Sequence, residues 1–164
     1  MVPYKRFDLV INAFSKLSNE KLLIIGDGPG RKNLELRTKN LGADNIKFLG
    51  RVSDEELSKY YQGCKALIFP QEEDFGIVPI EAMASGKPII AYRTGGALET
   101  VKEGETGLFF DEQTAEALAE AVRNFDEKKF NPEKIKKWAQ KFDQQIFKNK
   151  IDLFIKRRYT RKRR

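Results

Sequence analysis

Histidine is absent from the 164-residue sequence, and cysteine occurs once, as Cys64. These absences exclude a disulfide within the chain, a histidine-based metal site and a catalytic triad built on histidine. No apolar run reaches the roughly twenty residues that a membrane-spanning helix needs, and no secretory leader opens the sequence. We therefore expect a cytoplasmic protein.

Charge imbalance is confined to one end of the sequence. The formal net charge is +7, and residues 156–164 contain seven Lys or Arg residues and no acid. The rest of the chain is formally neutral, which argues against nucleic acid as a partner of the globular part. We expect a single domain at 1–155 and a basic tail at 156–164. The tail is either a solvated end or an attachment to the anionic inner face of the membrane.

Short apolar segments alternate with amphipathic segments along the chain. The expected strands are 21–25, 46–49, 66–69, 88–92 and 107–110. The expected helices are 7–17, 31–41, one that starts after the capping box Ser53–Glu56, 77–85, 114–125, one that starts after Asn131 and Pro132, and 143–155. Continuous apolar strands between helices are typical of a parallel sheet covered on both faces. The pattern predicts an α/β fold, a doubly wound parallel sheet in a Rossmann-like three-layer sandwich.

Ligands of such folds bind beyond the carboxyl ends of the strands, here at the turns 26–30, 50–53, 70–76 and 93–96. Of these four turns, residues 70–76 and the helix after them have the groups best suited to bind a ligand. Gly76 lets the backbone approach a ligand, and the helix that follows it offers unpaired N–H groups suited to a diphosphate. Glu73 on the loop and Glu81 in the helix have carboxylates that can accept hydrogen bonds from sugar hydroxyls. We expect both side chains to face one crevice.

The residues around these two glutamates resemble a known signature. Seven residues separate Glu73 from Glu81, within Glu-Asp-Phe-Gly-Ile at 73–77 and Glu-Ala-Met-Ala-Ser-Gly at 81–86. This pattern is similar to that of retaining GT-B glycosyltransferases of family 4 (glycosyl transferases group 1). Further matches lie in the family's order at 4–14, 24–29, 48–53, 94–101 and 104–108. The resemblance covers residues 4–125 and implies the C-terminal, nucleotide-sugar-binding half of a GT-B fold.

The resemblance also implies roles for individual residues. Glu73 would bind hydroxyls of the donor hexose, and Lys5 would neutralise the departing diphosphate, so both are predicted to be catalytic. Glu81 would hold the ribose hydroxyls. Other donor contacts are expected from Gly26, Gly28, Arg51, Val52, Phe75, Gly76 and Ile77. No Asp-x-Asp metal motif occurs, so Lys5 and the helix N-terminus are expected to stabilise the leaving group without a metal. We expect no cofactor besides the nucleotide sugar.

The form Glu-Asp-Phe-Gly-Ile is similar to that of mannosyltransferases that build surface polysaccharides, which favours GDP-mannose as the donor. The family resemblance implies a glycan or lipid-linked acceptor. The family's N-terminal acceptor domain has no counterpart in this sequence, nor does the strand ending in Gly-Arg that precedes the lysine. Transfer would therefore need that domain or a partner chain, and we expect this chain to be inactive alone.

Two other functions remain open. The first is a nucleotide-binding or interaction module without transfer activity. The second is an NADP-dependent oxidoreductase with Arg51 on the 2′-phosphate. The turn at 26–30 argues against the latter, because the third glycine of a dinucleotide motif would fall at Arg31. Glu73, Glu81 and Lys5 also have a simpler interpretation, as ordinary charged surface residues.

Overall fold

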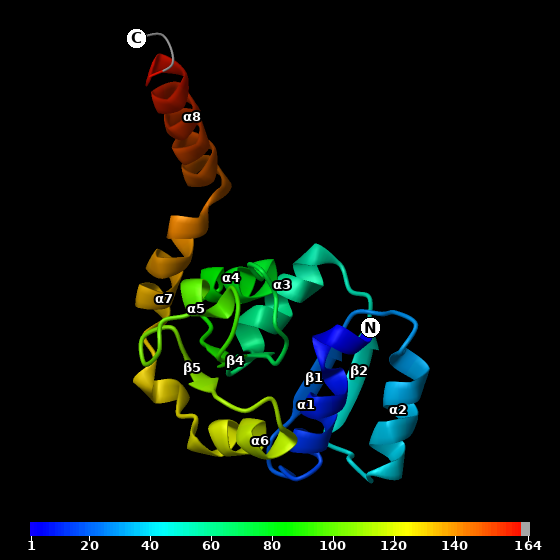
Figure 1. Ribbon diagram of the computed structural model, residues 1–164. Coiled ribbons are helices and arrows are strands. Elements are labelled where there is room, and N and C mark those ends of the chain that lie inside the picture. Colours follow the sequence, from blue (N-terminus) through cyan, green and yellow to red (C-terminus); the bar gives the residue numbers. More distant parts are fainter. Residues whose placement is uncertain (162–164) are drawn as a thin grey trace.

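The computed structural model describes residues 1–161, in which strands and helices alternate (Figure 1). The strands are β1 (Leu22–Ile25), β2 (Ile46–Gly50), β3 (Leu67–Phe69), β4 (Ile89–Tyr92) and β5 (Gly107–Phe110). The α-helices are α1 (Phe7–Phe14), α2 (Arg31–Asn40), α3 (Asp54–Gly63), α4 (Ile77–Ala84), α5 (Ala97–Thr100), α6 (Ala115–Asn124), α7 (Pro132–Ala139) and α8 (Gln144–Arg161). Short 3-10 helices are η1 (Pro3–Lys5), η2 (Glu127–Lys129) and η3 (Gln140–Phe142). Each predicted strand and helix is present, and the α/β prediction is confirmed.

The strands form two parallel sheets instead of the single sheet that the sequence predicted. One has the order β1-β2 and the other β3-β4-β5. Within the described residues, no strand bridges β1 and β3, so each is an edge strand of its sheet. Leu23 in the middle of β1 points to the face opposite that of Leu22 and Ile24 and is 45% exposed, which is unusual for a leucine in a strand of this kind.

Two apolar clusters place helices on opposite faces of the larger sheet. Successive strand residues point to opposite faces, and Ile90 belongs to one cluster whereas Ile89 and Ala91 belong to the other. The first cluster also contains residues of α1, β1, β2 and α6, and the second contains residues of α4, α5 and α7. This arrangement is the expected three-layer sandwich, and it brings the carboxyl ends of β3 and β4 to one edge.

The C-terminal helices differ in how they pack. The Asn131 side chain caps α7, as predicted, because its Oδ1 accepts hydrogen bonds from the N–H groups of Glu133 and Lys134. The Trp138 indole donates to the Thr100 carbonyl oxygen at 2.7 Å and fixes α7 to the body. The next helix, α8, projects away from the body (Figure 1).

A tail separate from the domain was expected from residue 156, but α8 continues through that position to Arg161. Its basic residues therefore extend a helix. Residues 162–164 of the predicted tail lie outside the described residues. Within residues 1–161, no helix is both long and apolar enough to cross a bilayer.

Candidate functional site

The loop at residues 70–76 leaves the carboxyl end of β3 and packs directly on the turn that follows β4. The Gly96 N–H donates to the Glu73 carbonyl oxygen at 2.7 Å. A Cβ atom at Gly95 would lie 2.5 Å from that oxygen, and one at Gly96 would lie 2.5 Å from the Asp74 carbonyl oxygen. Only glycine at both positions allows this approach, so two of the four predicted turns form one unit.

The two residues predicted to be catalytic, Lys5 and Glu73, are in contact. Lys5 is the last residue of η1, and its amino group forms an ion pair and a hydrogen bond with the Glu73 carboxylate. Their side chains are 27% and 19% exposed, so the pair lies at the surface but is partly shielded from water. The buried Gln71 side chain also donates to Glu73, at 3.3 Å. Both contacts fix the carboxylate at the carboxyl edge of the larger sheet.

The segment that carries Lys5 is fixed by contacts that the sequence did not reveal. Arg6 has φ +52°, and within residues 1–161 all other residues in this left-handed region are glycines. The Arg6 guanidinium donates to the Gln113 side chain, whose amide donates to the Pro70 carbonyl oxygen at 2.9 Å. This chain of hydrogen bonds connects the start of α1 to the start of the 70–76 loop.

Helix α4 begins at Ile77, immediately behind that loop. Gly76 precedes it with φ +79°, and a Cβ atom there would lie 2.9 Å from Cζ of the buried Phe69. Helical geometry leaves the first N–H groups, those of Ile77 and Val78, without acceptors within the helix. Ile77 is 64% exposed, and no acidic residue lies in the first turn. The helix end is therefore open to an anion.

Glu81 and Glu73 do not share partners. The Glu81 carboxylate accepts a hydrogen bond from the Tyr61 hydroxyl of α3 at 3.1 Å. Burial of Tyr61, together with the negative charge of Glu81, raises the pKa of the phenol, so its hydroxyl remains protonated and donates. Glu81 itself is exposed. The two carboxylates are thus held separately, and a crevice shared by both stays a prediction.

Phe75, another predicted donor contact, packs at the opposite end of the loop. Its ring is 44% exposed and meets Phe142 of η3 edge-on, with centroids 6.0 Å apart. Phe142 in turn meets Trp138 at 5.9 Å. This contact between the C-terminal segment and the loop was not predictable from the sequence, because the aromatic residues involved fit ordinary helix packing equally well.

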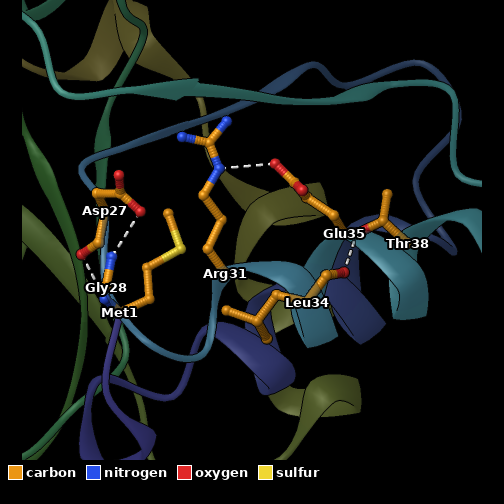
Figure 2. Close-up of polar contacts among 7 residues, drawn as sticks. All are labelled: Met1, Asp27, Gly28, Arg31, Leu34, Glu35 and Thr38. Atoms are coloured by element: carbon orange, nitrogen blue, oxygen red, sulfur yellow. Dashed lines mark hydrogen bonds and ion pairs between the residues drawn. The ribbon is translucent and has the colours of Figure 1, made fainter.

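The turns after β1 and β2 form a second part of the site. The Gly26 N–H donates to the Gly50 carbonyl oxygen at 2.7 Å, which places the predicted turns 26–30 and 50–53 side by side. Arg51 is exposed and Val52 is half-buried. Around Gly28 the turn is closed by Met1, whose terminal amino group donates to the Asp27 carbonyl oxygen (Figure 2).

The capping box that follows Val52 is confirmed in both halves. The Glu56 N–H donates to the Ser53 hydroxyl oxygen at 3.2 Å, and the Ser53 N–H donates to the Glu56 carboxylate at 2.9 Å. Hydrogen bonds from the Ser53 backbone and side chain lower the pKa of Glu56. The cap fixes the direction in which α3 leaves the 50–53 turn.

A separate hollow of about 350 Å³ lies between α1, along its length, and the start of α6. Asp8, Asn12 and Glu116 line it, and none of the predicted ligand-binding residues does. Within residues 1–161, no three acidic or cysteine side chains gather in a way that could hold a metal ion.

Comparisons with known proteins show the family to which this chain belongs. The family described as glycosyl transferases group 1 matches residues 1–162. An uncharacterized glycosyltransferase of Methanocaldococcus jannaschii is 35% identical over 147 residues, which cover 86% of this chain and 41% of that protein. The GDP-mannose-dependent alpha-(1-6)-phosphatidylinositol monomannoside mannosyltransferase of Mycobacterium tuberculosis is 33% identical over 135 residues, which cover 74% of this chain and 35% of that enzyme.

Among solved structures, sucrose-phosphate synthase of Thermosynechococcus elongatus superposes with a TM-score of 0.87 at 26% identity. The superposition covers 97% of this chain and 43% of that one. The chain therefore spans about two fifths of the length of these relatives. Its parallel α/β architecture is that of GT-B glycosyltransferase structures, and the chain belongs to the family of glycosyl transferases group 1.

Proposed function

We propose that this chain is the donor-binding domain of a retaining, metal-independent hexosyltransferase that uses GDP-mannose. One observation carries the proposal: the Lys5 amino group and the Glu73 carboxylate meet at the carboxyl edge of the sheet, on the loop that leads into the open N-terminus of α4. A cation, a carboxylate and free backbone N–H groups are the chemistry that a sugar diphosphate requires.

In this proposal, the donor diphosphate replaces Glu73 as the partner of Lys5. The N–H groups of Ile77 and Val78 bind the phosphate oxygens, and Glu73 accepts hydrogen bonds from hexose hydroxyls. The bond between C1 of the sugar and the diphosphate oxygen breaks, and both electrons leave with the nucleoside diphosphate. The acceptor oxygen forms the new bond to C1 on the same face, and its proton passes to the departing diphosphate. Lys5 stabilises the charge that develops there.

Mannose is favoured by two related observations. The sequence has the Glu-Asp-Phe-Gly-Ile form at 73–77, and the M. tuberculosis relative is GDP-mannose-dependent by name. That relative acts on a phosphatidylinositol monomannoside by name, which supports a lipid-linked acceptor for this chain.

Helix α8 supports the need for a further domain or a partner chain that binds the acceptor. It projects from the body (Figure 1) and exposes large apolar side chains, namely Ile146, Phe147, Ile151, Leu153, Phe154 and Ile155. Exposed apolar side chains gathered on one element are typical of an interaction surface. The run of basic residues from Lys156 onward in the sequence supports binding to an anionic membrane near such an acceptor. On this basis, this chain alone binds the donor but does not transfer the sugar.

The test is a melting-temperature panel of this chain with GDP, UDP, ADP and NADPH. A ligand at about 100 times its Kd stabilises the folded state by about 2.7 kcal/mol, which a melting curve resolves. GDP should give the largest increase, and Glu81→Ala should abolish it without unfolding the protein. Glu120→Ala, which removes an exposed carboxylate of α6, is the matched control. A shift with NADPH alone would contradict the proposal.

A further inference from the structure

Arg31 stands at the first position of α2, directly after the turn 26–30, and its side chain is held in one direction. Its Nε donates to the Glu35 carboxylate one turn later at 2.7 Å, and its side chain is 29% exposed. Figure 2 shows that Nε alone is joined to Glu35 and that the two terminal nitrogens lie beyond it without a marked contact. Among residues 1–161 they have no hydrogen-bond acceptor. Arg31 therefore presents two oriented and unused donor groups.

These donors lie over the end of β2. Gly50 has φ +72°, and a Cβ atom at this position would lie 2.8 Å from Nη1 of Arg31. The absence of a side chain at Gly50 is what lets the guanidinium occupy this space. Arg51 and Val52 follow immediately, and they are the residues expected to flank the nucleobase. Arg31 thus lies at the base end of the proposed donor site, although it belongs to α2 and not to the turn at 50–53.

Two carboxylates lie near the guanidinium of Arg31. The hydrogen bond to Glu35 raises the pKa of Arg31, and the nearby carboxylate of Asp27 acts in the same sense. The Asp27 side chain accepts a hydrogen bond from the Gly28 N–H at 2.7 Å and lies beside Arg31 without a direct contact (Figure 2). A planar guanidinium anchored through Nε has its two remaining nitrogens placed for bidentate recognition of paired acceptors.

We propose that Arg31 selects guanine as the base of the nucleotide donor, by donating from its terminal nitrogens to the guanine O6 and N7 atoms. This inference rests on the proposed function, because it assigns the base of the same donor. Guanine offers two neighbouring acceptors on this edge. Adenine pairs one acceptor with an amino donor that would face the guanidinium, and uracil offers a single carbonyl oxygen there. The discriminating group lies outside the 51–52 turn on which the sequence placed base binding.

The experiment measures the Kd of GDP, UDP and ADP by calorimetry for this chain and for Arg31→Met. The loss of a bidentate contact to guanine should weaken GDP binding by about tenfold or more. ADP binding should change by less than twofold. Arg37→Met is the matched control, because Arg37 lies on the same helix and donates through Nε to Asn12. It should leave all three Kd values unchanged.

A second measurement does not depend on how the variant folds. The ligand 7-deaza-GDP lacks the N7 acceptor but keeps the rest of GDP. It should bind the unmodified chain several-fold more weakly than GDP, and Arg31→Met should bind both ligands equally. Equal weakening of GDP, UDP and ADP in Arg31→Met would overturn the inference and assign Arg31 to the phosphates or to packing. If the unmodified chain binds no nucleotide, the proposed function itself fails and base selection fails with it.

Discussion

The amino group of Lys5 and the carboxylate of Glu73 form an ion pair, although 68 positions separate the two residues in the sequence. The contact joins the segment before α1 to the loop after β3. Because the pair is only partly exposed, each charge has the other as its nearest counter-ion until a ligand enters. A bound diphosphate would compete with Glu73 for the lysine, which makes Lys5 the first residue to test.

We predict that Lys5→Ala lowers the affinity for GDP by about tenfold or more, because a hydrogen bond to a charged group is worth about 1.5–3 kcal/mol. Affinity for guanosine should stay unchanged, since it lacks the diphosphate. Calorimetric titration with both ligands checks this. Lys16→Ala removes a lysine that pairs with Glu116 on α6 and serves as the control. Equal loss for GDP and guanosine would contradict a phosphate contact.

The close approach of Gly96 to the 70–76 loop leads to a second prediction. Gly96 has φ −63°, so alanine is compatible with its backbone, and the cost is steric: a Cβ atom would lie 2.5 Å from the Phe75 Cα atom. Overpacking of this kind costs about 1–3 kcal/mol. Gly96→Ala should therefore lower the free energy of unfolding in urea and also weaken GDP binding, because the loop carrying Glu73 must move.

Gly63→Ala is the matched control for that change. Gly63 ends α3, and a Cβ atom there meets nothing within 4 Å. Alanine has a higher helix propensity than glycine, so this variant should be neutral or slightly more stable. If Gly96→Ala binds GDP as tightly as the unmodified chain, the loop position does not determine the site.

The order of elements was predictable from the sequence because each strand is a short apolar run and each helix has a periodic apolar face. The division of the sheet was not, because β1 and β3 each have apolar patterns suited to a strand inside a sheet. The four-residue α5 is too short to show a periodicity. Helix α8 passes residue 155 because basic residues are compatible with a helix, so a change of charge did not mark its end.

Some features of the candidate site were likewise predictable from the sequence, and others were not. The glycine turn at 93–96 was predictable as the end of a strand. Its packing on Glu73 was not, because the two loops become neighbours only in the folded structure. The bonds that join Arg6 to Gln113 and Pro70 involve residues of ordinary type in loops that are far apart in sequence. The left-handed backbone of Arg6 has no sequence signal either, since glycine is the residue that normally marks such a position.

The cap of α3 gives a prediction on stability and its pH dependence. Ser53→Ala should lower the free energy of unfolding by about 1 kcal/mol at pH 7. The folded state lowers the pKa of Glu56 below its ordinary value of 4.5, so its contribution is complete above that value and is lost as the pH falls through the folded pKa. The destabilisation by Ser53→Ala should therefore shrink between pH 6 and pH 2.5.

Urea unfolding across that pH range measures the effect. Ser58→Ala, an exposed change within the same helix, is the control, and its small effect should not vary with pH. A Ser53→Ala effect of constant size would show that the Ser53 hydroxyl does not contribute to the pKa shift of Glu56.

The hydrogen bond from Tyr61 to Glu81 leads to the last prediction. If Glu81 binds the ribose hydroxyls, the Tyr61 hydroxyl fixes the direction of the carboxylate, and Tyr61→Phe should weaken GDP binding by about three- to tenfold. Binding of 2′,3′-dideoxy-GDP should not change, because that ligand lacks the hydroxyls that Glu81 would accept. The preference for the ribonucleotide, measured as the ratio of the two Kd values, should therefore fall in the variant.

Tyr60→Phe is the matched control, because Tyr60 is the neighbouring tyrosine of α3 and its hydroxyl has no hydrogen-bond partner among residues 1–161. It should leave the ratio unchanged. Equal weakening of both nucleotides by Tyr61→Phe would mean that Tyr61 acts only through the packing of α3 against α4. A reduced ratio with unchanged dideoxynucleotide binding would instead connect the Tyr61–Glu81 pair to the ribose, since packing alone has no means of distinguishing ligands that differ only in two hydroxyl groups.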